Sequence, residues 1–488
     1  MSEESIRESK IKNLDFFKTI GVDPYPVSFK RDKNLAEIVK SFVDANDQSF
    51  RVKTAGRIML LRPQGKAGFA NIIDESGKIQ IYVRLDIVGE KQFEMFRHLD
   101  LGDIIGVEGE LFRTRTGEIT VKVESLTLLS KIIETLPEKY HGLTDIETRV
   151  RRRYVDLIIH SEIRDLFKKR SLIIEAIRNF LEQKGFLEVE TPMLQPLYGG
   201  AAARPFITHH NTLDMDMYLR ISPELYLKRL IVGGFEKIYE INRNFRNEGI
   251  SYKHNPEFTM LELYEAYADY KDMMTLVEEI VCTANSAVNG SMKIKYKDYE
   301  IDLTPPWKRI SFLDLIKEKT GIDFLKIQDE EAVIKAREAG IEIDDKMSKW
   351  KIMDEFFKVK VEPFLIQPTI VYDYPVEISP LAKQKKDNPE IVERFEPFIA
   401  GQEIGNAFSE LNDPFEQRRR FELQLKEKMK GDEEAHRMDE DFITALEFGM
   451  PPTGGLGVGI DRLIAILLNC HSIREVILFP ALRPEHKQ

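Results

Sequence analysis

Five short β-rich stretches between residues 51 and 130 constrain the fold more than any other feature of the sequence. They run over 52–61, 69–73, 78–84, 104–112 and 118–128, and turn signals at Glu75-Ser-Gly-Lys and Thr114-Arg-Thr-Gly-Glu separate the later pairs. Five strands in so short a segment predict a small Greek-key barrel of the oligonucleotide-binding architecture. Because the chain has 488 residues, such a barrel must accompany at least one larger domain.

Alternation along these stretches predicts which side chains leave the barrel core. Ile58 and Leu60 are expected on the core side of the first strand, because alternate residues of a strand share a face. The opposite, outer face would then offer stacking, amide and charged groups that suit single-stranded nucleic acid, as an oligonucleotide-binding barrel does. An ordinary solvated sheet face explains the pattern equally well. The candidate contacts on this face are Arg57, Phe69, Gln80 and Glu108.

The barrel, expected over 51–135, lies between two other regions. Residues 1–50 show two helical patterns around Pro24 and Pro26, and the segment either adds nucleic-acid affinity or packs on the barrel. Residues 136–488 are expected to form one α+β domain with a helical insertion at about 270–367. A basic cluster at 149–153 is either a solvated face or a nucleic-acid contact.

Composition limits the kind of protein. The chain carries 82 acidic and 71 basic residues, a net charge of −11, which excludes a surface coated in positive charge for unspecific nucleic-acid binding. Aliphatic runs are much shorter than the ~18 residues of a membrane span, and the amino-terminal residues mix both charges, unlike a signal peptide. Cys282 and Cys470 are the two cysteines. We therefore expect a cytoplasmic protein that is not bound to a membrane.

The segment 235–270 concentrates polar side chains on two predicted strands around a polar loop. Alternation places Glu240, Asn242, Asn244 and Arg246 on one face of the first strand. If the two faces coincide, an arginine, carboxylates and an aromatic ring meet, which favours a charged ligand over a purely internal network of ion pairs. The second strand would contribute Phe258, Met260, Glu262 and Tyr264.

The glycine-rich segment 449–468 predicts a strand followed by an apolar helix. It is neither a P-loop nor a dinucleotide fingerprint, because no Lys-Ser/Thr follows the glycines and Ile460 occupies the place of the third glycine. Arg462 at the start of the helix would suit a polyphosphate. In the segment 401–413, Glu403 and Glu410 could hold Mg²⁺, but their spacing leaves helix and strand open and surface charge is the simpler interpretation.

Together these segments resemble the signature motifs of the class II aminoacyl-tRNA synthetases, in particular the lysyl-tRNA synthetases of subclass IIb. Pro192 matches the proline of the first motif, Phe245-Arg-Asn-Glu-Gly the second, and Gly455-Leu-Gly-Val-Gly-Ile-Asp-Arg462 the third. The resemblance covers nearly the whole chain from the barrel onward. It implies an antiparallel sheet of six or seven strands flanked by helices, a homodimer formed through the first motif, and a barrel that reads the anticodon.

The resemblance also implies a reaction, in which ATP and L-lysine form lysyl-adenylate and pyrophosphate before lysine is transferred to the 3′ end of tRNA(Lys). Arg246 would bridge the lysine carboxylate and the α-phosphate, Phe258 would stack on adenine, and Arg462 would lie on the other side of the ring and reach the γ-phosphate. Further implied ATP contacts are Glu248, His254, Asn255 and Glu403. The implied Mg²⁺ ligands are Glu403 and Glu410, with more than one ion expected. The implied lysine contacts are Gly200, Glu224, Arg246, Glu262, Tyr264 and Asn412.

Two other functions compete with this interpretation. A lysine ligase that modifies a translation factor would lack the anticodon barrel, which this chain is predicted to have. A catalytically silent, synthetase-like nucleic-acid-binding protein would have no need of Arg246, Glu403, Glu410 and Arg462. Aspartyl and asparaginyl specificities are disfavoured, because Glu262 would repel an acidic side chain and, with Tyr264, suits an ammonium group.

Overall fold

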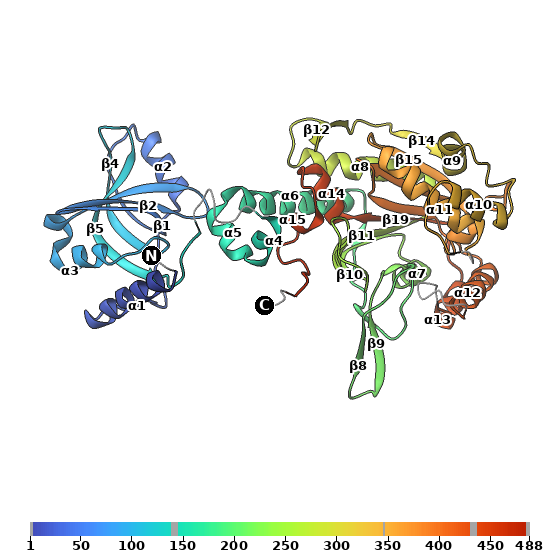
Figure 1. Cartoon of the computed structure of the whole chain (residues 1–488), viewed down its shortest axis with the longest axis horizontal. Helices are drawn as coiled ribbons and strands as arrows, with labels where there is room; N and C mark the ends of the chain where they lie inside the picture. Colours follow the sequence, from blue (N-terminus) through green and yellow to red (C-terminus); the bar gives the residue numbers. More distant parts are fainter. Residues whose placement is uncertain (1–2, 138–144, 345–346, 430–436, 485–488) are drawn as a thin grey trace. The chain divides into compact units, whose positions relative to one another are not determined.

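The computed structural model describes residues 3–137, 145–344, 347–429 and 437–484. The chain forms two compact units, Met1–Thr144 and Asp145–Gln488, whose elements are labelled in Figure 1. None of the helices in the described ranges combines the length and hydrophobicity of a membrane span.

A closed five-stranded barrel forms the core of the first unit, with the strand order β1-β2-β3-β5-β4. Its neighbouring strands are antiparallel except for β3 and β5, which are parallel. The predicted barrel is therefore confirmed, and helix α3 (Leu85–Arg97), which the pattern did not predict, connects β3 to β4. The strands are β1 (Arg51–Gln64), β2 (Ala67–Ile73), β3 (Lys78–Arg84), β4 (Ile104–Arg113) and β5 (Ile119–Ser130).

One core prediction in the barrel is wrong. The pairing of β1 with β2 shifts register between Ile58 and Leu60, so Ile58 is buried whereas Leu60 lies opposite Asn71 on the outer face. Leu61, opposite the buried Ala70, packs against the core instead. A bulge adds one residue to a strand and reverses the faces of all residues beyond it, which strict alternation cannot anticipate.

The two amino-terminal helices, α1 (Glu3–Thr19) and α2 (Leu35–Asp44), share the hydrophobic core of the barrel. Phe17 of α1 and Phe42 of α2 are fully buried in it. Asn34 caps α2 in a reciprocal capping box with Glu37. Of the two roles open for residues 1–50, the structure supports packing on the barrel.

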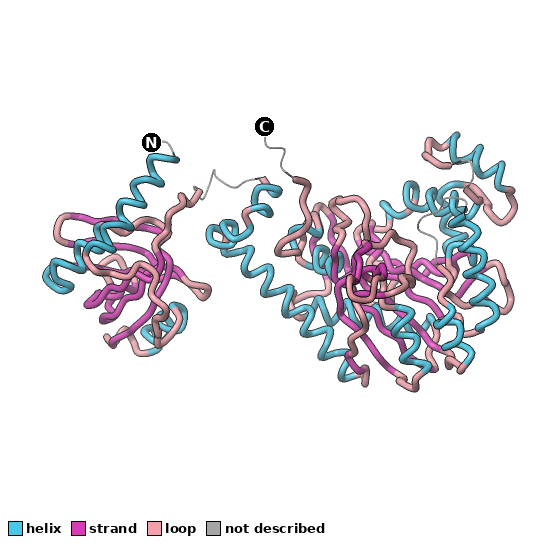
Figure 2. Tube along the Cα trace, turned by 90° about the horizontal axis from the view of Figure 1, so that it is seen from below, coloured by secondary structure: helices cyan, strands magenta, loops and turns pink. Residues whose placement is uncertain are grey.

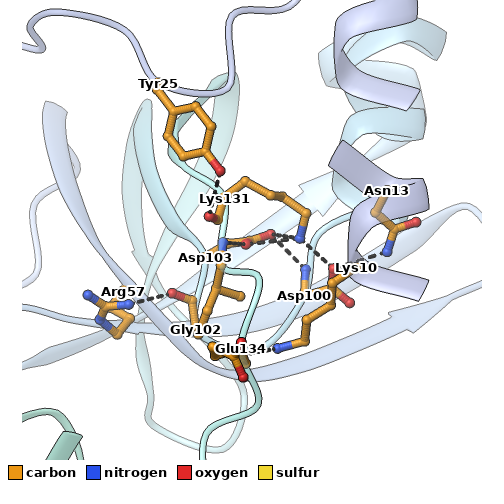
Figure 3. A network of polar contacts seen from close by, with 10 residues as sticks. Lys10, Asn13, Tyr25, Arg57, Asp100, Gly102, Asp103, Lys131 and Glu134 are labelled. Carbon is orange, nitrogen blue, oxygen red and sulfur yellow. Dashed lines mark hydrogen bonds and ion pairs between the residues drawn. The ribbon is translucent and has the colours of Figure 1, made fainter. Parts of the chain in front are cut away.

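A buried ion-pair network fastens α1 to the barrel (Figure 3). The Lys131 ammonium, fully buried, pairs with Asp100 and lies 2.9 Å from Asp103 Oδ2. From α1, Asn13 Nδ2 donates to Asp100 Oδ2 at 3.0 Å, and Lys10 Nζ donates to the Glu134 carbonyl at 2.6 Å. Helix and barrel thus share a polar anchor as well as an apolar core.

A nine-stranded sheet forms the centre of the second unit, in the order β14-β15-β16-β18-β19-β11-β10-β6, with β17 paired to β16. Its middle is antiparallel, but β14 and β6 join the two edges in parallel. The sheet is therefore mixed and larger than the six or seven antiparallel strands implied by the resemblance, because short strands extend both edges. The strands are β6 (Leu187–Glu188), β10 (Lys237–Phe245), β11 (Glu257–Ala266), β14 (Lys308–Ser311), β15 (Thr369–Pro375), β16 (Ile391–Ile399), β17 (Gln402–Glu403), β18 (Gly405–Ser409) and β19 (Thr453–Gly459).

Helices α6 (Ser161–Gln183), α8 (Tyr270–Ser286) and α14 (Ile460–Leu467) bury apolar residues in one core with this sheet, and Figure 2 shows helices flanking its strands. The expected insertion at 270–367 is not uniform. Its first helix, α8, belongs to the main core, whereas α9 (Phe312–Thr320), α10 (Asp329–Glu338) and α11 (Lys349–Lys360) pack in a separate cluster. That cluster also includes side chains of β15 and β16.

The remaining elements surround the sheet. A small sheet has the order β7-β9-β8, and β12 pairs with β13. Helices α7, α12 and α13 bury side chains in a further apolar cluster. The remaining elements of the second unit are α4 (Ile146–Arg151), α5 (Arg153–Ile159), β7 (Leu194–Gln195), β8 (Ile207–His210), β9 (Met215–Leu219), α7 (Glu224–Val232), β12 (Lys293–Tyr296), β13 (Tyr299–Asp302), η1 (Glu362–Phe364), η2 (Val376–Ile378), α12 (Pro414–Met429), α13 (Glu440–Glu447) and α15 (Ile473–Val476).

The basic cluster at 149–153 is partly structural. Arg153 is buried, pairs with Asp156 at 2.8 Å and donates from Nε to the Leu478 carbonyl at 3.1 Å. Arg149 pairs with the same aspartate at 2.9 Å. These two arginines hold α5 and the segment around Leu478 together, so the cluster is not simply a nucleic-acid contact.

Candidate active site

The register of β10 with β11 confirms that the two polar faces coincide. Glu240 lies opposite Glu262, and Asn244 lies opposite Phe258. On the other side of β11, Glu262 lies opposite Gly457 and Tyr264 opposite Gly455 of β19. One face of the sheet therefore carries the acidic and aromatic residues beside a strand of alternating glycines.

The glycines of β19 make room for these side chains. A Cβ at Gly455 would lie 1.9 Å from Glu410 Oε1 and 2.7 Å from Tyr264 Cε1. Gly200 has a φ of +85° and a Cβ there would lie 2.9 Å from both Glu224 Cβ and Ser222 Oγ. The absence of side chains at these positions lets carboxylates from three segments converge.

The converging residues line a cavity of about 520 Å³. Asn412 is not among its lining residues, because its Nδ2 donates to the Met450 carbonyl at 2.9 Å and its Oδ1 accepts from Lys383 at 2.7 Å. Its predicted contact with lysine is therefore not supported by the geometry. The other predicted residues of this site all line the cavity: Gly200, Glu224, Arg246, Glu248, His254, Asn255, Phe258, Glu262, Tyr264, Glu403, Glu410 and Arg462.

One end of the cavity is acidic and closed to solvent. The side chains of Glu224, Glu262 and Glu410 are all buried there. Ser222 Oγ donates to Glu262 Oε1 at 3.1 Å, and the Tyr264 hydroxyl lies 3.5 Å from Glu262 Oε2. Burial, together with the charge of Glu224, raises the pKa of Glu262 to about 8. Three carboxylates so placed favour a ligand that brings positive charge.

A fully buried ammonium, that of Lys228 on α7, lies behind two of these carboxylates. Its Nζ is 2.5 Å from Glu224 Oε1 and forms an ion pair with Glu410 Oε2. Burial lowers the pKa of Lys228, but the charges of Glu224 and Glu410 more than reverse this effect and the pKa lies above its usual value. Both oxygens of Glu410 are buried without a hydrogen-bond partner in the described part of the chain, and the ion pair with Lys228 involves Oε2 rather than Oε1.

Arginine and aromatic side chains mark the middle of the cavity. The Arg246 guanidinium lies 5.1 Å from the centre of the Phe258 ring, and its Nε is buried without a partner among the described residues. Burial lowers the pKa of Arg246, while Glu248, Glu262 and Glu403 oppose that change. An arginine fork held in this way can bind an anion in bidentate fashion.

The other end of the cavity brings Arg462 and Glu403 together. Arg462 Nη1 donates to the Glu403 carbonyl and lies 3.5 Å from Glu403 Oε2. Glu396 of β16 lines the same cavity; burial raises its pKa to about 7, Arg394 opposes this, and the charge of Glu403 adds to it. A cation beside Glu396 and Glu403 would relieve their repulsion.

The implied Mg²⁺ ligands Glu403 and Glu410 do not lie so that they could share one ion. Glu403 ends β17 and Glu410 directly follows β18, and the register of both strands with β16 shows that the chain between them is extended. Seven extended residues span roughly 20 Å, and Mg²⁺ ligands must lie about 2.1 Å from the ion. Glu410 instead pairs with Lys228, and the carboxylate that accompanies Glu403 is Glu396.

The loop between β10 and β11 is fixed by polar contacts from its own residues. His254 Nδ1 lies 2.9 Å from Ser251 Oγ, and burial, with Arg462, lowers the pKa of His254. Asn255 Nδ2 donates to the Glu257 carbonyl at 2.5 Å and its Oδ1 accepts from Ala481 N at 3.1 Å. The Asn255 side chain therefore holds the loop in place while lining the cavity.

Sequence reasoning missed several residues of this site. Lys228, Ser222 and Glu396 had no motif to distinguish them, and Phe408 of β18, whose ring centre is 5.3 Å from Lys228 Nζ, lies in an apolar stretch. Strand alternation, which placed Glu262, could also have placed Glu396. Arg394 and Glu396 lie on one face of β16, and Arg394 lies opposite Phe408 of β18.

On the barrel, two of the four predicted nucleic-acid contacts lie together. Phe69 stacks on Tyr82 with ring centres 4.6 Å apart, and Gln80 lies two residues from Tyr82 on the same face of β3. Gln80 Oε1 accepts from the Thr120 hydroxyl at 2.9 Å. The exposed Arg62 lies opposite Phe69 across β1 and β2, and the bulge in β1 hid it from the sequence pattern.

The side chains of the other two predicted contacts, Arg57 and Glu108, bind other groups of the protein. Arg57 Nη1 donates to the Gly102 carbonyl at 2.7 Å (Figure 3), and burial lowers the pKa of Arg57. Glu108 forms an ion pair with Lys53 at 2.6 Å. Phe69, Gln80, Tyr82 and Arg62 thus form the stronger candidate surface for stacking and base contacts.

Comparisons with known proteins agree with this geometry. Residues 145–483 match the family of tRNA synthetases class II (D, K and N), and residues 52–129 match the OB-fold nucleic acid binding domain. The lysine–tRNA ligase of Pelotomaculum thermopropionicum is 58% identical over 98% of this chain and 94% of the relative. Those of Carboxydothermus hydrogenoformans and Staphylococcus saprophyticus are 57% and 54% identical, over 97% and 99% of this chain and 97% and 100% of the relatives. The chain therefore belongs to the lysyl-tRNA synthetases of class II.

Proposed function

We propose that this chain carries out the reaction of its family, activating L-lysine with ATP and transferring it to tRNA(Lys). The observation that carries the proposal is the polarity of the cavity. Glu224, Glu262 and Glu410 are buried at one end, and Arg246 lies between them and the Arg462 end. A substrate with two ammonium groups and one carboxylate matches this distribution of charge.

The acidic end provides the specificity. The α-ammonium is assigned to Glu224, beside Gly200, and the ε-ammonium to Glu262 and Tyr264 with Glu410 added from the structure. An aspartate side chain would place a further negative charge among buried carboxylates, which is strongly unfavourable. Ornithine, one methylene shorter, would be rejected by only about 1–3 kcal/mol.

Arg246 and Arg462 carry the chemical step. The lysine carboxylate is already anionic near neutral pH, so the attack on the α-phosphate needs no general base. Arg246 would hold both anions in line and stabilise the charge that develops between them, with adenine stacked on Phe258 and Arg462 reaching the γ-phosphate. The guanidinium beside the ring of Phe258 supports this assignment.

Mg²⁺ is proposed as the cation of the ATP phosphates, with Glu403 and Glu396 as its carboxylate ligands. No cluster of three or more metal-binding side chains occurs among the described residues, so phosphate oxygens would complete the ligand set. The ion would neutralise charge on the leaving pyrophosphate. Glu403 and Glu396 can supply hard oxygen ligands, and mutual repulsion favours a cation between them.

The barrel is proposed to bind the anticodon through Phe69 and Gln80, with Tyr82 and Arg62 beside them.

A homodimer formed through the first motif is proposed because that region exposes large apolar side chains. Light scattering coupled to size-exclusion chromatography tests this proposal. We also propose a cytoplasmic location, which the free thiols of Cys282 and Cys470 suit. The exposed apolar side chains on which the proposed homodimer rests are Leu172, Leu187, Met193, Leu194 and Ile207.

The decisive experiment is ATP–pyrophosphate exchange with purified protein and each of the twenty amino acids. Lysine is expected to support exchange, and aspartate and asparagine are not. Exchange with aspartate or asparagine but not with lysine would disprove the specificity, and no exchange with any amino acid would favour a catalytically silent binding protein. Charging of tRNA(Lys) with labelled lysine then tests the second step.

A further inference from the structure

Lys228 is the feature of the acidic end that the proposed function leaves without a role. It is fully buried and does not line the cavity, yet its Nζ contacts carboxylates from two different elements. Glu224 lies one turn earlier on α7, and Glu410 follows β18. Burying a lysine ammonium is energetically costly unless its partners are ionised. Lys228, Glu224 and Glu410 therefore favour one another's charged forms.

The contacts also determine which carboxylate oxygens face the ligand. The Lys228 ammonium forms ion pairs with Glu224 Oε1 and Glu410 Oε2. Neither oxygen of Glu410 has a hydrogen-bond partner in the described ranges, and Oε1, which is not the oxygen in the ion pair with Lys228, occupies the space left by the missing side chain of Gly455, which lines the cavity. A buried carboxylate oxygen without a partner is unfavourable until a donor reaches it.

We propose that Lys228 is a positioning residue whose ammonium is a built-in counter-ion of the lysine pocket. It favours the ionised forms of Glu224 and Glu410 before the substrate arrives, and it pairs with one oxygen of each so that the other remains for the substrate ammonium groups. The proposal deepens the proposed function and rests on it.

The surrounding charges show why a counter-ion is needed. Among the described residues, Glu224 is influenced by Lys228 and by Arg394 of β16, and Glu410 by Lys228, Glu224 and Glu262. The pKa of both Glu224 and Glu410 lies above its usual value, and that of Glu410 lies well above it, because burial raises it and the charge of Lys228 opposes this only in part. The phenol of Tyr264 faces the same carboxylates, which, with burial, raise its pKa, so it stays neutral. Without Lys228, the two carboxyls would share a proton that lysine would have to displace.

The consequence is a difference in proton release that a scaffolding role would not produce. In the wild type, Glu262, with a pKa of about 8, is a carboxyl that gives up a proton near neutral pH when lysine binds. Lys228→Met should release about one further proton, because an acid proton replaces the missing ammonium. Its KM for lysine should rise about tenfold at pH 7, that of ATP should stay within about twofold, and the loss should shrink toward pH 8.5.

The test is isothermal titration of the full-length protein with L-lysine at pH 7 in two buffers of different ionisation enthalpy, which counts released protons. Lys228→Arg keeps the charge and should match the wild-type count. Lys237→Met is the matched control, because Lys237 pairs with Glu265 at 2.6 Å away from the cavity lining. An unchanged count in Lys228→Met, or unchanged lysine affinity at pH 7, overturns the proposal.

A double variant, Lys228→Met with Glu410→Gln, covers the case in which the single variant does not fold, since it removes an acid together with the base. Its proton count should return to that of the wild type although lysine binds more weakly, and a count about one proton higher overturns the proposal. The outcome is separable from the proposed function. Absence of lysine-dependent exchange in the wild type refutes the function, whereas normal exchange with an unchanged count refutes only the role of Lys228.

Discussion

The Glu410 carboxylate fills the space that a side chain at Gly455 would need, because its Oε1 lies 1.9 Å from a Cβ built on Gly455. The strand of glycines in the third motif therefore leaves room for side chains of the acidic end of the cavity. This relationship links the third motif to that end of the cavity.

Gly455→Ala should accordingly impair lysine binding. The added methyl group displaces Glu410 and Tyr264, and overpacking of this kind typically costs about 1–3 kcal/mol. The KM for lysine should rise by about ten- to a hundredfold in the exchange assay, more than that of ATP. Gly457→Ala is the matched control, because a Cβ there would lie 3.2 Å from the flexible end of Met260 and should be tolerated better. A larger effect at 457 than at 455 would contradict this prediction.

Glu262→Gln should weaken lysine far more than ATP and should flatten the pH dependence of lysine binding. The pKa of Glu262 is raised to about 8 in the free protein, so the carboxylate that binds the ammonium group becomes populated as pH rises toward 8. The KM for lysine in the wild type should therefore fall about tenfold per pH unit below 8 and level off above it. Initial rates between pH 6.5 and 8.5 measure this; an equal loss of lysine and ATP affinity in the variant would show that the pocket is assigned wrongly.

Arg246→Lys should abolish most of the exchange activity despite keeping the charge. A lysine offers one compact ammonium in place of a planar fork, so it cannot hold two anions in bidentate geometry. Loss of such a contact in the transition state lowers kcat by about a hundredfold or more. Arg243→Lys, which changes an exposed arginine of β10 that pairs with Glu257 of β11, is the control and should keep near-normal activity. Near-normal exchange in Arg246→Lys would refute the bridging role.

Phe69→Ala should impair charging of tRNA while leaving lysine-dependent exchange intact, because the barrel residue touches neither lysine nor ATP. Base stacking on an aromatic ring contributes about 1–3 kcal/mol, so the KM for tRNA(Lys) should rise by about five- to a hundredfold. Tyr25→Ala, an exposed aromatic of the same unit, should have little effect. A Phe69 variant that charges tRNA normally would remove the anticodon role from this surface.

Lys131→Met should destabilise the barrel selectively. It leaves Asp103 buried without its cation, a change that costs about 3–5 kcal/mol. Hydrogen exchange of residues 51–130 at increasing urea concentrations measures the loss. Lys122→Met removes an exposed pair with Glu110 and should cost less than about 1 kcal/mol. Burial raises the pKa of Asp103, so protonation should reduce the loss as pH falls; a loss that grows at low pH would contradict this explanation.

Much of the site could be predicted because strand alternation is a local property. Parity alone put Glu262 and Tyr264 on one face of their strand and Glu240 and Arg246 on one face of the other, and the register of β10 with β11 shows that the two faces coincide. Leu60 was placed wrongly because a bulge is not visible in a single strand, and the carbonyl that holds Arg57 is not visible there either. The spacing of Glu410 from Glu403 did not reveal whether the chain between them is extended.

The sequence by itself determined the barrel, the two polar strands, the glycine strand with Arg462 and the resemblance to a family. These features depend on residue type and short-range periodicity, which the chain carries without folding. Only the tertiary structure decided which carboxylates meet. Glu410 joined Glu224 around Lys228, and Glu396 joined Glu403, because charges distant in the chain become neighbours through strand register and helix packing. Burial then changed their chemistry, and burial is a property of the assembled core.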